Sequence, residues 1–286
     1  DSYLSCPVTA ETVEAAILEE KEKPFAVYLT SPDYLGNLAP VGEIASVCHR
    51  HGVPLLVDNA HGAYLKFLPR SLHPMDLGAD LCSDSAHKTL PVLTGGAYLH
   101  MGPDWTTEEA KAAMALFGST SPSWLILQSL DGANPAMERL PGDIAALAPH
   151  IAALKGALLA HGFALVGAEP LKITVHAAKF GYSGEEMAEI LEKQGIFCEF
   201  ADVDVTSMTL SVTCLACSRT FGSSMSISSL NISASGSWRL MINLPNTGLL
   251  LLLRLLTAFD RIAIINIIAT KLPMQRITPS IKYTSF

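Results

Sequence analysis

The chain has 286 residues, of which 49% are hydrophobic and 16% charged, and its formal net charge is −8 at pH 7. This composition supplies enough apolar material for one large domain or two medium ones and excludes a chain that is disordered throughout. Lysine and arginine are not clustered, so the sequence argues against a nucleic-acid partner, which requires concentrated positive charge.

Cysteine spacing and the apolar stretches indicate a cytoplasmic protein without a membrane span. The six cysteines are irregularly spaced, and reduced thiols are the expected state. The pair Cys214-x-x-Cys217 lacks a second pair or a nearby histidine, so we predict no metal site. Residues 249–268 are the most apolar stretch, but they include three charged residues that a bilayer disfavours. We expect a buried helix followed by a buried strand there.

The N-terminal part of the chain is predicted to alternate helices and strands. Thr9 can cap a helix that ends before an apolar strand at residues 25–29. The apolar face of this helix is formed by Val13, Ala16 and Ile17. Pro40 opens a second helix that Gly52 ends, and residues 53–57 form the next buried strand. Continuous apolar strands alternating with helices are typical of a parallel sheet covered on both faces.

The same sequence patterns predict further helices and strands in the rest of the chain. Strands are expected at residues 77–83, 95–100, 171–175 and 196–200. Helices are expected to begin at Thr106 and Ser183, each with a capping glutamate three residues later, and at 121–123. A long helix at 141–161, rich in alanine and leucine, would lead into a second domain of α+β type.

Residues 204–240 differ from the rest of the chain because serine and threonine dominate and charges are few. Apolar and polar residues alternate in parts of the stretch, as in an inserted hairpin. A misread frame or a misjoined segment would give the same composition, and both interpretations stay open. The stretch predicts no function.

A carboxylate and a lysine mark the region richest in chemical groups. Asp58 ends one predicted strand, and Lys88 follows the next within a run of serine and histidine. Pyridoxal phosphate needs a lysine amine for its aldehyde and an anion beside its ring nitrogen. Its phosphate takes hydroxyls and imidazoles, which Ser83, Ser85 and His87 provide. On spacing alone, the interpretation of Asp58 as a capping residue and Lys88 as a surface lysine is favoured over a cofactor site, because one aspartate and one lysine make a weak motif.

At these residues the chain resembles the Orn/Lys/Arg decarboxylase family, which uses pyridoxal phosphate on the aspartate aminotransferase fold. The matching blocks are T-S-P-D-Y-L-G at 30–36, P-L-L-V-D-N-A-H-G-A at 54–63, L-G-A-D at 77–80, S-A-H-K-T-L-P at 85–91 and S-T-S-P-S-W at 119–124. The resemblance covers roughly residues 7–203. In this family, a phosphate-binding loop and a histidine that stacks on the cofactor lie upstream of residue 1, so the chain would carry about half of the site.

The resemblance implies a role for each matching residue. Lys88 would form the Schiff base with the cofactor, and Asp58 would pair with its ring nitrogen. Ala60 would pack on one face of the ring. The other implied cofactor contacts are His61, Ser85, His87, Ser119 and Thr120. Ser119 and Thr120 would lie near a dimer interface and reach the neighbouring subunit's phosphate, whereas a helix cap by Ser121 is the alternative. His87 would also reach the substrate carboxylate, and no metal is implied.

Three functions follow from these observations. The first is decarboxylation of lysine, arginine or ornithine to an amine used in polyamine metabolism, by a homodimer or a higher homo-oligomer. The second is another reaction on the same scaffold, such as that of an aminotransferase or a lyase. The third is a non-catalytic remnant that serves only in folding or dimerisation.

The expected fold is a three-layer α/β/α, mainly parallel sheet followed by a smaller α+β domain. Residues 1–137 are predicted to form the later half of the large cofactor-binding domain, and residues 138–286 the smaller one. The start at Asp1, without an initiator methionine, suggests a piece of a longer protein.

Overall fold

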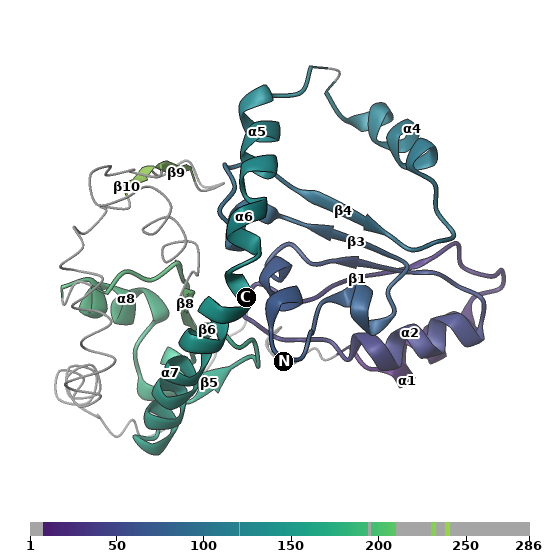
Figure 1. Cartoon of the computed structure of the whole chain (residues 1–286). Coiled ribbons are helices and arrows are strands. Elements are labelled where there is room, and N and C mark those ends of the chain that lie inside the picture. Colours follow the sequence, from purple (N-terminus) through teal and green to yellow (C-terminus); the bar gives the residue numbers. More distant parts are fainter. Residues whose placement is uncertain (1–7, 120, 194–195, 210–229, 233–237, 241–286) are drawn as a thin grey trace, which may run out of the picture. The chain divides into compact units, whose positions relative to one another are not determined.

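The computed structural model describes residues 8–119, 121–193, 196–209, 230–232 and 238–240 (Figure 1). The chain divides into two compact units, the first comprising Asp1–Pro149 and Ser211–Asn246 and the second comprising His150–Leu210 and Thr247–Phe286. The boundary at residue 137 suggested by the sequence stays a prediction. Each unit is described by itself below.

A four-stranded sheet organises the first unit (Figure 1). Its strands, in spatial order, are β1 (Val27–Thr30), β2 (Leu55–Asp58), β3 (Leu81–Asp84) and β4 (Tyr98–Met101). The first three strands are parallel, and β4 pairs antiparallel to β3. The register places Thr30 beside Asp58 and Asp58 beside Ser83. The carboxyl ends of the parallel strands therefore meet at one edge, where ligands of such sheets bind.

Two amphipathic helices, α1 (Ala10–Glu19) and α2 (Val41–Arg50), pack against one face of the sheet (Figure 1). Thr9 caps α1 as the sequence predicts, and Thr12 completes a capping box. The buried side chains that join these helices to the sheet are Val13, Ile17, Ile44, Cys48, Leu29, Leu55 and Val57. Ala16, predicted on the inner face of α1, is exposed instead.

The opposite face of the sheet is open at several positions within the described ranges. Tyr28 is 65% exposed and Leu99 is 42% exposed, and Thr30 and Ser83 are exposed as well. The predicted α/β architecture is confirmed, but the described residues leave these positions uncovered. Because register-paired residues share a face, Asp58 and Ser83 lie on this open side.

Short helices connect the strands, and longer ones follow them. They are η2 (Ala63–Phe67), η3 (Pro74–Leu77), α3 (Ala86–Thr89), α4 (Thr107–Phe117), α5 (Trp124–Gly132), α6 (Asn134–Met137) and α7 (Leu140–Ala160). The capping box of Thr106 and Glu109 is present at α4. The residue that precedes α5 is Ser123, so the alternative of a helix cap by Ser121 is wrong.

By length and composition, α7 would be long and apolar enough to cross a membrane. That test alone is weak, since core helices pass it too. Its buried apolar side chains are Leu140, Ile144, Leu147, Ile151 and Leu158. They recur at helical spacing along one stripe, which is the pattern of a helix that packs against protein.

The second unit contains an antiparallel sheet in the order β5-β6-β8-β7. Its elements are β5 (Leu165–Val166), β6 (Lys172–Val175), η4 (Ala177–Phe180), α8 (Gly184–Glu192), β7 (Phe200–Ala201) and β8 (Thr206–Thr209). Ser183 and Glu186 form the predicted capping box of α8. The strand predicted at 196–200 is shorter than expected, because only Phe200 and Ala201 pair with β8.

The serine- and threonine-rich stretch is described only in part. Its first residues form β8, and β9 (Leu230–Ile232) pairs antiparallel with β10 (Trp238–Leu240). The predictions for residues 214–217 and 249–268 lie outside the described residues. Cys48 and Cys82, which lie within the described part of the chain, are buried free thiols.

Candidate functional site

The loops that follow β2 and β3 bring Asp58 and Lys88 into one region. Asp58 is the last residue of β2, and Lys88 lies in α3, the single helical turn that follows β3. His61, in the loop after β2, links the two because its Nε2 lies 3.1 Å from Lys88 Nζ. This contact spans the two sequence blocks that were predicted to share a site.

The Asp58 carboxylate is half-buried and held by two donors. The backbone N–H of Ala60 donates to Oδ1 at 3.0 Å, and the Tyr28 hydroxyl donates to Oδ2 at 3.2 Å. Burial and the negative charge of Asp58 raise the pKa of the Tyr28 phenol, which keeps it a donor. Sequence reasoning missed Tyr28, although a tyrosine near the end of the apolar strand predicted at residues 25–29 was a usable signal.

Lys88 is exposed, and its environment includes two rings. An ammonium can only donate, so a charged Lys88 donates to His61 Nε2, which puts the ring proton on Nδ1. Tyr34 packs edge-on against His61, with ring centroids 5.1 Å apart and an angle of 89°. Tyr34 belongs to the T-S-P-D-Y-L-G block, whose Asp33 carboxylate accepts from Leu35 N and Asn37 N. That block thus positions a ring against the histidine.

Ser85 and His87 flank the start of α3. The backbone N–H and the Nδ1 of His87 both lie near the carbonyl oxygen of Gly96, at 3.2 and 3.0 Å. This double contact fixes Nδ1 as a donor and leaves Nε2 for other partners. Gly96 is required by space, because a Cβ there would lie 2.3 Å from Val92 Cγ1. Ser85 precedes α3 without capping it by its side chain.

The segment at 119–121 is not brought to Lys88 by the described contacts. Ser119 is exposed, and its hydroxyl accepts from the backbone N–H of Ser121 at 3.1 Å. Thr120 lies outside the described residues. The predicted contact of these residues with a cofactor phosphate stays a prediction.

A buried network around Asp84, at the end of β3, was not anticipated from the sequence. Asp84 is 3% exposed. Its carboxylate accepts from Asn59 Nδ2 at 2.7 Å, from His73 Nε2 at 3.0 Å and from His100 Nε2 at 2.9 Å. Burial alone would raise the pKa of Asp84, but the hydrogen bonds from His100 and His73 outweigh it and hold that pKa well below the usual range. Asp84 is therefore ionised at neutral pH.

His73, Asp84 and His100 have the composition of a metal site, with ligand atoms within 4.8 Å of one another. The hydrogen bonds favour a different account. His73 Nδ1 accepts from the backbone N–H of Met75 at 3.3 Å, so its Nε2 carries the proton and donates to Asp84. A protonated nitrogen cannot bind a cation, and the donors already satisfy the carboxylate.

The residues at the strand ends fit pyridoxal phosphate by their chemistry. A primary amine and a carboxylate lie on neighbouring strand ends, and the half-buried Ala60 offers only a methyl group between Asp58 and His61. The Ser85 hydroxyl and the His87 imidazole could hold a phosphate. Lys88 and Asp58 are the two groups that this cofactor requires from its protein.

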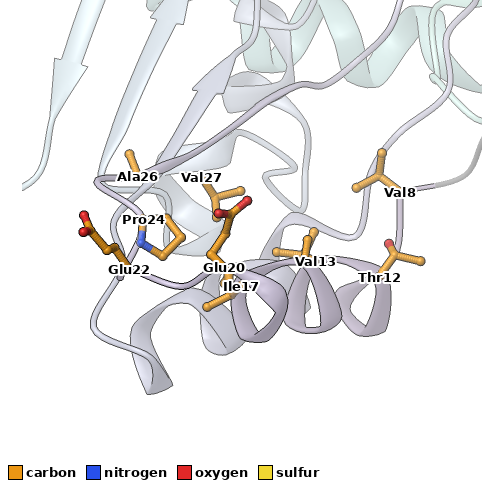
Figure 2. Close-up of a pocket in the computed structure, with 10 residues that line it drawn as sticks. Val8, Thr12, Val13, Ile17, Glu20, Glu22, Pro24, Ala26 and Val27 are labelled. Atoms are coloured by element: carbon orange, nitrogen blue, oxygen red, sulfur yellow. The ribbon is translucent and has the colours of Figure 1, made fainter.

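A pocket of about 430 Å³ lies elsewhere, between α1 and the approach to β1 (Figure 2). Val13, Ile17 and Val27 contribute apolar walls, and Glu20 and Glu22 also line it. None of the residues predicted to bind a cofactor lines it. The candidate site is therefore the pair of strand-end loops, not this pocket.

The fold resembles solved pyridoxal-phosphate enzymes of fold type I. The lysine decarboxylase LdcF of Francisella novicida has a TM-score of 0.57 and 20% sequence identity, covering 71% of this chain and 36% of that chain. A structure described as SPT with PLP has a TM-score of 0.57 and 19% identity, covering 71% and 54%. The SepCysS–SepCysE N-terminal domain complex has a TM-score of 0.54 and 16% identity, covering 73% and 61%. These likenesses confirm the fold class.

Sequence comparison gives the family. Residues 4–147 match the Orn/Lys/Arg decarboxylase major domain, and the chain belongs to this family. The uncharacterised protein YaaO of Bacillus subtilis is 34% identical over 225 residues, which is 73% of this chain and 46% of that protein. The arginine decarboxylase of Halalkalibacterium halodurans is 34% identical over 135 residues, 46% of this chain and 27% of that protein. The chain thus spans less than half the length of these relatives.

Proposed function

We propose that the chain provides the lysine-bearing part of a pyridoxal-phosphate-dependent decarboxylase that acts on lysine, arginine or ornithine. The observation that carries the proposal is the contact between His61 and Lys88, which joins the Asp58 loop to the amine. Family membership supports the reaction class, and the proposal includes the cytoplasmic location expected from the sequence.

When bound, pyridoxal phosphate would supply an aldehyde that joins to amines and a ring that accepts the electron pair left on the substrate carbon when CO₂ departs. Asp58 would hold a proton on the ring nitrogen. Its two oxygens already accept from Ala60 N–H and the Tyr28 hydroxyl, which fixes the carboxylate before any ligand arrives. A charge fixed in advance avoids the cost of reorganisation during the reaction.

His61 would control the proton on Lys88. Its Nε2 lies close enough to accept a proton from Nζ, and only the deprotonated amine is a nucleophile. Tyr34, packed against the ring, limits its rotation. His87, the residue before Lys88, is anchored through Nδ1, so its Nε2 would contact a phosphate or a substrate carboxylate.

The test is product analysis with each basic amino acid. With added pyridoxal phosphate, we expect release of CO₂ and the matching amine from lysine, arginine or ornithine. A keto acid in place of CO₂ would identify an aminotransferase instead. A folded chain that binds the cofactor but releases neither product from any of the three would favour the non-catalytic remnant.

The α4–α5 surface supports a homo-oligomer. Phe117 is 94% exposed and Trp124 is 78% exposed, and the exposed Leu116 and Leu125 adjoin them in sequence around Ser119. Exposed apolar side chains gathered in this way mark interaction surfaces. We propose that a second copy of the chain covers them, as the family resemblance implies for the segment at 119–121.

Charged substitutions test this interface. We expect Phe117→Asp combined with Trp124→Asp to convert an oligomer into a monomer in sedimentation velocity, because burying a charge without a partner is unfavourable. Leu18→Asp, at an exposed leucine of α1, is the matched control and should leave the mass unchanged. An oligomer that persists in the double variant would exclude this surface as the interface.

A further inference from the structure

We propose that Asn59 and Asp84 form a positioning pair that fixes the loop after Asp58 relative to the helical turn that carries Lys88. The pair lies on the covered side of the sheet. The inference rests on the proposed function, because it assigns these residues to the same cofactor site. Neither residue was assigned a role from the sequence. Neither is placed to touch the reacting atoms, so both would act through their chain neighbours.

The alternation of side chains along the strands places the pair. Asp58 and Ser83 are register partners and share the open face. The residues that follow them, Asn59 and Asp84, therefore point to the other face. The hydrogen bond from Asn59 Nδ2 to Asp84 Oδ1 at 2.7 Å closes this side, and Asn59 N donates to Ser83 O at 2.9 Å. Each member directly adjoins a cofactor segment, Asp58 on one strand and Ser85–Lys88 on the other.

Asp84 is itself rigidly held. His100 reaches it from β4 and His73 from the segment before η3, while the Cys82 thiol lies 3.5 Å from Oδ1. An ionised carboxylate only accepts, so the amide nitrogen of Asn59 must face it. The orientation of Asn59 is thereby dictated by Asp84.

The orientation of the Asn59 amide is energetically unfavourable, and a contribution to the stability of the fold does not explain it. Asn59 is fully buried, and its Oδ1 has no hydrogen-bond partner among the described residues. An unsatisfied buried acceptor is destabilising and is uncommon enough to require a reason. A fixed loop geometry at a ligand site is such a reason.

Gly62 shows how closely the loop is fitted around Asn59. A Cβ at residue 62 would lie 2.0 Å from Asn59 Oδ1 and 2.7 Å from Pro32 Cδ. The backbone N–H of Gly62 also donates to Asn59 O at 2.8 Å. The absence of a side chain at this position thus lets Asn59 reach Asp84 and lets the loop turn back toward His61.

The experiment compares Asn59→Ala with Gly62→Ala and with Ile44→Val, a mild truncation in the core at a residue with 0% exposure. Three quantities are measured on the full chain: the dissociation constant for pyridoxal phosphate, the unfolding temperature, and amide hydrogen exchange at 58–62 and 85–88 without cofactor. Asn59→Ala should weaken cofactor binding by about tenfold, since it removes a hydrogen bond to a charged group. Exchange should rise in both segments.

The controls separate positioning from stability. Ile44→Val should lower the unfolding temperature and leave cofactor affinity and exchange in the two segments unchanged. Gly62→Ala should reproduce the loss of affinity although it alters neither member of the pair, and if it fails to fold, Asn59→Ala decides. Unchanged affinity and exchange in Asn59→Ala would overturn the inference. Absence of cofactor binding in the unaltered chain would refute the proposed function, while exchange in the unloaded variants would still decide the positioning role.

Discussion

Replacement of Lys88 by alanine is expected to abolish covalent attachment of pyridoxal phosphate and to lower decarboxylation on the order of 10³-fold or more, as loss of a nucleophile does in other enzymes. Lys88 Nζ is the amine that His61 contacts at 3.1 Å. The measurements are the visible absorbance of the bound cofactor and the mass of the 85–91 peptide after borohydride reduction.

The matched control is Lys111→Ala, at an exposed lysine of α4. It should retain the absorbance band, the modified peptide and the activity. Attachment that survives in Lys88→Ala, or a modified peptide elsewhere in the chain, would show that another lysine carries the cofactor. Unfolding temperatures close to that of the unaltered chain would establish that both variants are folded.

Sequence patterns predicted the elements because local physics determines most of them. Thr9, Thr106 and Ser183 cap their helices as expected, since a cap depends on residues only three positions apart. The convergence of Asp58 and Lys88 was predictable as well, because parallel strands place their carboxyl ends together. The antiparallel direction of β4 was not, since a short apolar run has the same pattern in either direction.

The residues that sequence reasoning missed are joined by contacts between distant segments. Asp84 accepts hydrogen bonds from His73, His100 and Asn59, which lie in three different segments, and no spacing rule connects these residues in the sequence. Tyr28 reaches Asp58 only because β1 and β2 are adjacent in the sheet. Such partners are set by tertiary packing.

The family resemblance predicted which residues belong to the site, but it did not predict which side chains surround them. The resemblance implied that His61 contacts the cofactor, and the structure puts it against both Lys88 and Tyr34. It implied a contact of Ser119 with the neighbouring subunit's cofactor phosphate, which stays a prediction, and within the described chain the Ser119 hydroxyl accepts from Ser121 N–H. A single chain therefore supplies contacts to examine at the strand ends, whereas contacts that need a partner subunit stay predictions.

Substitution of Asp58 by asparagine should reduce turnover by about 10²–10³-fold while the cofactor still attaches to Lys88, the cost typical of losing one preorganised electrostatic contact. The amide has nearly the shape of the carboxylate, so the N–H of Ala60 can still donate to Oδ1. The lost quantity is the negative charge that would keep the ring nitrogen protonated. Steady-state rates and the cofactor absorbance, measured on the same samples, separate attachment from turnover.

Tyr28→Phe separates the hydrogen bond from the charge, because it removes one donor to Asp58 and leaves the negative charge of Asp58 in place. We expect a loss of only a few-fold, in line with a single hydrogen bond at a half-exposed carboxylate. Asp104→Asn, at an exposed position after β4, should have no effect. If Asp58→Asn and Tyr28→Phe lose equal activity, the Asp58 charge is not the decisive feature, and the carboxylate would act mainly as the anchor of the β2 loop. A much larger loss in Asp58→Asn, with cofactor attachment intact, would assign the charge to the ring nitrogen.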